Sequence, residues 1–172
     1  FNKSDLNTLH QRHDYYPSEF LNNDFILFHF DEKWIHDNYI SEYTNIEPTE
    51  NNLISFINLL LLSSDKELVI TTGVDCPRIL DNILDNNFNN RVKIYKELDF
   101  LHLESLISKC KLLISCHGSV SHVAAAYNIK QIDIIEGKKF DFYSKWTDHF
   151  RGYFPLYRKK FSDLSKEIID LL

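Results

Sequence analysis

Short apolar runs alternate with segments of helical periodicity from residue 24 to the last residue. The apolar runs, which are typical of strands buried on both faces, are 24–30, 67–73, 91–96, 111–115 and 130–137. The segments with apolar residues at helical spacing are 48–64, 77–84, 100–110, 119–128 and 161–172. Pro48-Thr49 is a favourable start for the first of these helices, and Ser162 is the expected N-cap of the last.

A strand followed by a helix, repeated five times, predicts a parallel sheet with helices on both faces. Right-handed crossovers between parallel strands then favour a Rossmann-like, doubly wound α/β domain over residues 24–172. Residues 1–23 show no clean period, and we expect a linker or a surface strap there.

Composition agrees with one folded domain. The chain has 172 residues, of which 44% are hydrophobic, and its 13 Phe and 9 Tyr argue against disorder. The net charge of −6 argues against a broad nucleic-acid surface. No apolar run is long enough to span a bilayer. Because the sequence starts with Phe1 and has no Met, we expect it to be part of a longer protein.

The cysteines and one charged segment add to this. Cys76, Cys110 and Cys116 have no metal-ligand spacing and leave one thiol unpaired in any disulfide scheme, which favours a reduced, cytoplasmic setting. Residues 138–160 carry seven Lys or Arg against two Asp. A solvated face explains such a cluster, and so does a surface that meets phosphates, an anionic acceptor or membrane headgroups.

Three of the four glycines, Gly73, Gly118 and Gly137, directly follow expected strands. In a doubly wound sheet the carboxyl ends of the strands share one edge, and ligands bind in the crevice there. These glycines are either ordinary turns or places where backbone approaches a ligand.

The segment "SCHGSVSH" follows the fourth expected strand and has three chemical interpretations. A metal site is disfavoured, because His117 and His122 are five positions apart and no acidic third ligand is near in sequence. A nucleophile is disfavoured too: Ser119 matches G-x-S-x-G only loosely, and Cys116 is at a strand end where burial is expected.

An anion-binding loop fits this segment best. The strand ends at Ser115, Gly118 permits a turn, and a helix begins near Ser119. Free backbone N–H groups at Gly118, Ser119 and Val120 and the positive end of the helix dipole would then face the crevice. Ser119, Ser121 and His122 add side-chain donors suited to a diphosphate.

The stretch "LESLISKCKLLISCHGSVSHVAAAYNIKQIDII", residues 103–135, resembles the C-terminal half of heptosyltransferase-like glycosyltransferases of GT-B fold. That family has an Asp-Ser/Thr-Gly-Pro-x-His loop followed by alanines, and His122 and the alanines match it by position. His117 stands where the family has Asp, and Gly118-Ser119 replaces its Ser/Thr-Gly pair. A lysine after the first strand of this half approaches the donor phosphates in the family, and Lys33 is its counterpart here.

The resemblance implies a bacterial enzyme whose donor-binding half is this chain. The nucleotide-diphosphate sugar would be a substrate, with no cofactor and no metal, and the sugar would pass to a glycan or lipopolysaccharide-type, lipid-linked acceptor. The absent N-terminal half would bind the acceptor and carry the catalytic base. The α-helix start, His122 and Lys33 would stabilise charge on the leaving diphosphate. We expect a cytoplasmic protein, with peripheral contact at the inner face of the membrane through residues 138–160.

The nucleoside is expected across the ends of the second and third strands. The residues expected there are Thr72, Gly73, Glu97, Leu98 and Phe100. Glu97, or else Glu136, would accept from ribose hydroxyls, although Glu97 also suits a plain exposed turn. His29, inside a strand, is expected to be a core residue, and Trp146 and His149 are expected to pack against other aromatic side chains.

Two other functions remain open from the sequence. A non-catalytic Rossmann-like module that binds a nucleotide or a partner is supported by His117 in place of the family's Asp. A sugar-nucleotide epimerase of similar fold is less favoured, because the sequence displays no evident acid–base pair.

Overall fold

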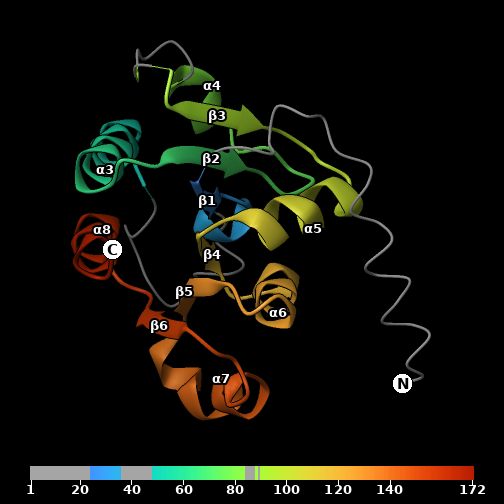
Figure 1. The fold of residues 1–172 in the computed structure, drawn as a ribbon. Coiled ribbons are helices and arrows are strands. Elements are labelled where there is room, and N and C mark those ends of the chain that lie inside the picture. The colour runs from blue at the N-terminus through green and yellow to red at the C-terminus, as the bar shows by residue number, and fades with distance from the viewer. Residues whose placement is uncertain (1–23, 36–47, 84–87, 89) are drawn as a thin grey trace.

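A six-stranded parallel sheet forms the centre of the computed structural model, which describes residues 24–35, 48–83, 88 and 90–172 (Figure 1). The strand order is β3-β2-β1-β4-β5-β6, and all five neighbouring pairs are parallel. The strands are β1 (Phe25–His29), β2 (Glu67–Thr71), β3 (Val92–Tyr95), β4 (Leu112–Cys116), β5 (Lys130–Ile135) and β6 (Tyr153–Tyr157). This order confirms the predicted doubly wound, Rossmann-like α/β fold.

Helices cover both faces of the sheet. The α-helices are α3 (Glu50–Ser63), α4 (Ile79–Ile83), α5 (Phe100–Lys109), α6 (Ser119–Ala126), α7 (Phe140–Thr147) and α8 (Phe161–Asp170), and two short 3₁₀ turns are η3 (Glu32–Trp34) and η4 (Gly137–Lys139). Helices α3 and α8 lie on one face and α5 and α6 on the other (Figure 1). Within the described residues, no helix is long and apolar enough to cross a membrane.

Alternation in β1 explains why the sheet needs both helical layers. Ile26 and Phe28 face the core cluster that contains α3 and α8. Phe25 and Leu27 face the second cluster, which contains α5 and α6. All four side chains are at most 3% exposed, as expected of a central parallel strand.

The structure corrects the C-terminal third of the predicted pattern. Residues 138–160, which suggested only a basic segment, contain η4, α7 and β6. Strand β6 was missed because it is a half-exposed edge strand that contains Pro155, and proline is tolerated at a sheet edge. The last helix starts at Phe161, so its N-cap is Lys160 and not Ser162, which lies inside the helix. The expected linker at 1–23 lies outside the described residues.

Trp34 fixes the turn that follows β1. Its indole Nε1 donates to the carbonyl oxygen of His29 at 2.9 Å, and its ring lies 5.2 Å from Phe28 and 6.0 Å from Phe161. The side chain is 1% exposed. Turn η3 is therefore anchored in the core, and this anchor sets the position of the neighbouring Lys33.

We expect Trp34→Phe to lower the free energy of unfolding by about 2 kcal/mol, because the carbonyl of His29 loses its donor and a smaller ring fills the site. Urea denaturation followed by far-UV circular dichroism measures the change. The matched control is the other tryptophan, Trp146, which is 55% exposed, so Trp146→Phe should change stability by less than about 0.5 kcal/mol. Equal effects of the two changes would contradict the anchoring role of Trp34.

Candidate functional site

Polar residues collect where the carboxyl ends of the parallel strands meet. Lys33 follows β1, His117 follows β4, Glu136 follows β5 and Arg158 follows β6. These four side chains line one pocket with a volume of about 130 Å³, together with Tyr143 of α7. The pocket therefore lies at the edge of a doubly wound sheet where ligands are expected.

Lys33 extends across the start of α6. Its Nζ donates to Asp31 Oδ2 at 2.6 Å, and Asp31, which is 2% exposed, also accepts from the Lys33 amide at 3.2 Å. A Cβ atom on Gly118 would lie only 2.8 Å from Lys33 Nζ, so glycine leaves room for the ammonium group. Burial lowers the pKa of Lys33, but the charge of Asp31 and the hydrogen bond to it outweigh burial and raise the pKa overall, so Lys33 is a cation.

The start of α6 presents backbone donors beside this ammonium group. The amides of Ser119 and Val120 belong to the first turn, where no preceding turn supplies carbonyl acceptors. Val120 as a whole is 5% exposed, and its side chain packs in the second core cluster. Lys33 and the expected loop residues Gly118, Ser119 and Val120 therefore lie together.

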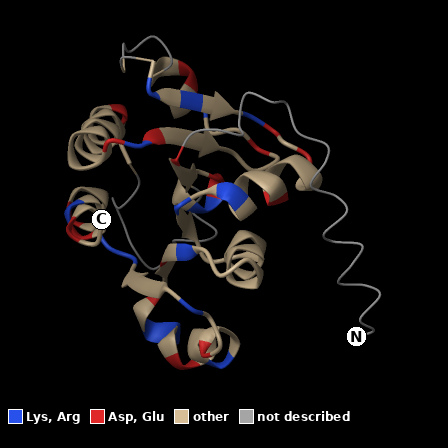
Figure 2. Ribbon diagram, viewed as in Figure 1, with Lys and Arg blue, Asp and Glu red and all other residues tan. Residues whose placement is uncertain are grey.

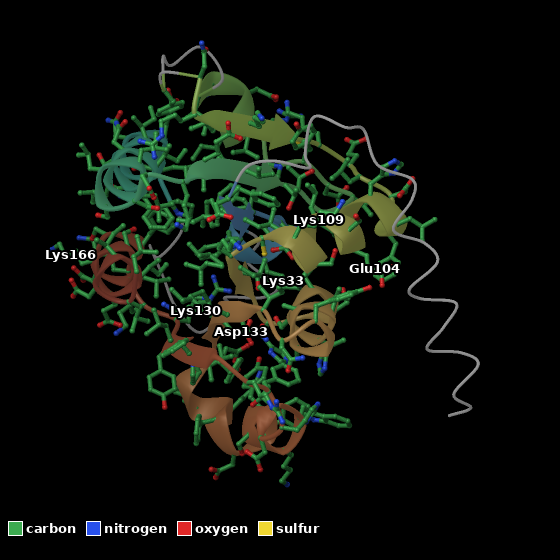
Figure 3. All side chains as sticks on the ribbon, in the orientation of Figure 1. Lys33, Glu104, Lys109, Lys130, Asp133 and Lys166 are labelled. Atoms are coloured by element: carbon green, nitrogen blue, oxygen red, sulfur yellow. The ribbon has the colours of Figure 1, made fainter. Side chains whose placement is uncertain are left out.

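Asp133, in the middle of β5, organises the loop from behind. This carboxylate is fully buried and accepts hydrogen bonds from Ser121 Oγ at 2.8 Å and from the Tyr153 hydroxyl at 3.0 Å. Its Oδ2 also lies 2.5 Å from His117 Nδ1. Figure 3 labels the buried Asp133 and the half-buried Lys33, which both lie beside β4 and β5. Burial, and then the charge of Asp133, raise the pKa of Tyr153, which keeps this phenol protonated as a donor.

Ser121 faces away from the expected ligand position. Its side chain is fully buried, its hydroxyl donates to Asp133, and its Oγ accepts from the Gly118 amide at 3.3 Å. The hydroxyl therefore supports the loop from within, whereas the sequence suggested a direct donor to a diphosphate.

The rings of His117, directly before Gly118, and His122, in α6, lie side by side. Their ring centroids are 5.5 Å apart, and the His117 ring also meets Tyr143 at 4.8 Å. Because Asp133 engages Nδ1 of His117, Nε2 is the ring nitrogen that remains for another partner. Burial, followed by the charge of His117, lowers the pKa of His122. In the part of the chain that is described, no three His, Cys, Asp or Glu residues are grouped to hold a metal ion.

The residues expected to bind the nucleoside lie further along the same edge. The Thr72 hydroxyl donates to the Gly73 carbonyl at 3.0 Å and accepts from the Glu97 amide at 2.9 Å, which joins the loops after β2 and β3. Glu97 is exposed and has a positive φ of 52°. Leu98 packs against the second core cluster, and Phe100, at the start of α5, is 54% exposed. These positions place Thr72, Gly73 and Glu97 together, with an exposed aromatic ring close by in sequence.

Two residues considered in the sequence are interior. His29 is 4% exposed and hydrogen-bonds Thr71 Oγ1 at 3.0 Å, and burial lowers the pKa of His29 to about 4. Cys116 is 1% exposed, and burial raises the pKa of its thiol to about 12, which disfavours a thiolate nucleophile. His29 is thus a core residue, as expected.

Sequence reasoning missed Asp31, Asp133, Tyr143, Tyr153 and Arg158. Asp133 had a visible signal, because a carboxylate in the apolar run "QIDII" must be paired when the strand is buried. Tyr153 is the first residue of β6, and Arg158 directly follows this strand. Because β6 was not predicted as a strand, the sequence did not indicate that these two residues lie at the sheet edge.

The fold is similar to solved structures of sugar-nucleotide enzymes. E. coli heptosyltransferase WaaC with ADP matches with a TM-score of 0.58 and 10% identity over 95% of this chain and 48% of its own. E. coli ADP-heptose lipopolysaccharide heptosyltransferase II matches with a TM-score of 0.62 and 12% identity, over 99% and 50%. UDP-GlcNAc 2-epimerase of Methanocaldococcus jannaschii, in complex with UDP-GlcNAc and UDP, matches with a TM-score of 0.58 and 15% identity, over 95% and 44%.

No family model matches the chain, and no curated protein matches it by sequence. The chain spans about half the length of each structure named above. At these identities the likeness shows the fold alone, namely one Rossmann-like half of the GT-B architecture.

Asp133→Asn tests the network behind the loop. An amide offers one acceptor oxygen where the carboxylate serves three partners, so we expect a loss of about 3 kcal/mol in the free energy of unfolding. Urea denaturation gives the value. Asp65→Asn is the control, because Asp65 is 96% exposed, and it should change stability by less than about 0.5 kcal/mol. An Asp133→Asn variant as stable as the control would show that the network does not hold the loop.

Proposed function

We propose that residues 24–172 are the donor-binding half of a heptosyltransferase-like glycosyltransferase. The observation that carries this proposal is the Lys33 ammonium group, held by Asp31 across the amino-terminal end of α6. A cation beside free backbone amides at a helix start is suited to a diphosphate. The likeness to heptosyltransferases supports it, as does ADP in one of those structures.

The proposed reaction is displacement at the anomeric carbon of the donor sugar. The acceptor hydroxyl forms the new glycosidic bond and gives its proton to a base from the other half of the enzyme, while the nucleoside diphosphate leaves. Lys33, the α6 amides and His122 stabilise the charge on the leaving group. The nucleoside lies over β2 and β3, near Thr72, Gly73 and Glu97, and the donor is a substrate, with no resident cofactor.

Calorimetric titration with ADP, UDP, GDP and CDP tests the donor site. We expect one nucleoside diphosphate to bind, and Lys33→Met to weaken it about 10-fold or more because a charge-assisted hydrogen bond is lost. His122→Ala should also weaken binding. Lys145→Met, which removes the same charge from an exposed position on α7, should leave the dissociation constant unchanged. Failure of the folded chain to bind any of the four would contradict the proposal and favour a non-catalytic module.

A sugar-nucleotide epimerase is the second candidate. The likeness to UDP-GlcNAc 2-epimerases favours it, and so does the His117–Asp133 pair, which is a combination suited to proton transfer. Incubation with UDP-GlcNAc in D₂O separates the two functions, because epimerisation at a carbon breaks a C–H bond and introduces deuterium there, whereas glycosyl transfer does not.

We further propose that α7 contacts a membrane that carries a lipid-linked acceptor. Phe142 and Trp146, one helical turn apart, are 58% and 55% exposed. Charged residues lie on and around this helix (Figure 2), and lysines outnumber acidic residues over 138–160. Exposed aromatic rings with flanking lysines suit the interface of an anionic bilayer. This proposal places the protein at the inner face of the membrane.

Co-sedimentation with vesicles of phosphatidylglycerol and phosphatidylcholine checks this contact. The bound fraction should fall at least about threefold in the double variant Phe142→Ser, Trp146→Ser, because two rings no longer enter the interface. Leu62→Ser is the control, since Leu62 is 83% exposed on the distant helix α3. Sedimentation that is equal for the wild type and the double variant would exclude α7 as the contact.

A further inference from the structure

Arg158 is a buried cation that forms no ion pair with any carboxylate of the described residues. The residue is 9% exposed, its Nη2 donates to Cys116 Sγ at 3.0 Å, and its guanidinium carbon lies 5.8 Å from the centre of the Trp34 ring. Its Nε is buried and has no hydrogen-bond partner among the described residues. A thiol and an aromatic ring supply no negative charge, so the cost of removing this cation from water is left uncompensated.

The other charges that line the pocket are already paired. Lys33 Nζ contacts Asp31 at 2.6 Å, and Glu136 contacts Lys139 Nζ at 2.8 Å. Over the ranges that the structure describes, no carboxylate forms an ion pair with Arg158. The lining therefore has one excess positive charge, and it belongs to Arg158, which is the most buried of the charged residues that line the pocket.

The pocket that Arg158 helps to line suits a small anion. The pocket has a volume of about 130 Å³, which is room for about four water molecules. That volume accommodates a carboxylate or a single phosphoryl group, and it is too small to enclose a whole nucleotide. His117 and Tyr143 also line the pocket and bring an imidazole nitrogen and a phenol to its wall. A planar guanidinium beside such donors matches the geometry of an oxyanion.

We propose that this pocket binds a compact oxyanion, a carboxylate or phosphoryl group, on the sugar that the donor carries. The assignment to the sugar rests on the proposed function. Lys33 borders both the pocket and Gly118 at the start of α6, so a group in the pocket neighbours the diphosphate. With the nucleoside over β2 and β3, the diphosphate over β1 and β4 and the pocket at β4 to β6, the donor would follow the order of the strands. The substrate class is therefore an acidic sugar nucleotide.

Thermal unfolding of the chain in orthophosphate, and separately in acetate, tests the pocket itself. We expect one of the two anions to raise the unfolding temperature of the wild type, and the anion that does so distinguishes a phosphoryl from a carboxyl ligand. Arg158→Leu should abolish this rise and, without anion, should be at least as stable as the wild type, because a buried unpaired charge is removed. Arg158→Lys keeps the charge and should retain part of the rise. Lys160→Leu, the same charge change at an exposed site, should keep all of it.

A paired titration tests the assignment to the sugar. UDP-glucuronate should bind about 10-fold tighter than UDP-glucose to the wild type, and equally to Arg158→Leu. If UDP does not bind, the same comparison is made with glucuronate and glucose 1-phosphates. If an anion raises the unfolding temperature but no nucleotide binds, the proposed function is contradicted, and the proposal of an anion-binding pocket still holds. Nucleotide binding with no anion effect, or an anion effect that Arg158→Leu retains, would overturn the pocket and leave the proposed function.

Discussion

The buried carboxylate of Asp133 is the interaction on which the site depends. It lies within β5 and binds His117 after β4, Ser121 in α6 and Tyr153 at the start of β6. One residue thus ties together the loop, the helix and the edge strand that form the carboxyl edge of the sheet. Because the carboxylate is fully buried, its charge is tolerated only when these hydrogen-bond partners are in place. Loss of the network would therefore also change the conformation of the loop.

A second feature is the contrast between the two cations that line the pocket: Lys33 is paired with Asp31, and Arg158 has no carboxylate partner among the described residues. Asp31 serves two purposes, since it caps η3 and orients Lys33, while Trp34 anchors the same turn in the core. These contacts therefore hold Lys33 in position without a bound ligand. Arg158 is positioned by β6 and by the Trp34 ring, but no carboxylate in the described part of the chain forms an ion pair with it. A buried charge of this kind costs stability, which is typical of binding sites and untypical of cores.

The sequence predicted strands β1 to β5, the helices that connect them and the doubly wound class, because buried parallel strands and amphipathic helices leave strong periodic signals. The shared edge of parallel strands placed the Gly118 loop at the expected crevice, and the family resemblance implied that Lys33 would lie beside it. The edge strand β6 was not predicted, because a half-exposed strand with Pro155 lacks that signal. The roles of Tyr153 and Arg158 depend on where β6 lies, so they were invisible for the same reason. The inward orientation of Ser121 depends on Asp133, twelve residues away, and on no local pattern.

The structure leads to a different interpretation of His117 from the one that the sequence suggested. In the sequence it stands where the resembling family has an aspartate, and that substitution favoured a module without catalysis. In the structure a carboxylate is still present at this point, but it belongs to Asp133 on the neighbouring strand and lies behind the imidazole. The surface that faces a ligand therefore changes from an acid to an imidazole nitrogen, which can donate or accept a proton. Such a change removes a negative charge from beside the proposed diphosphate and from beside the Arg158 pocket. Within the proposed function, this arrangement favours an anionic ligand beside His117.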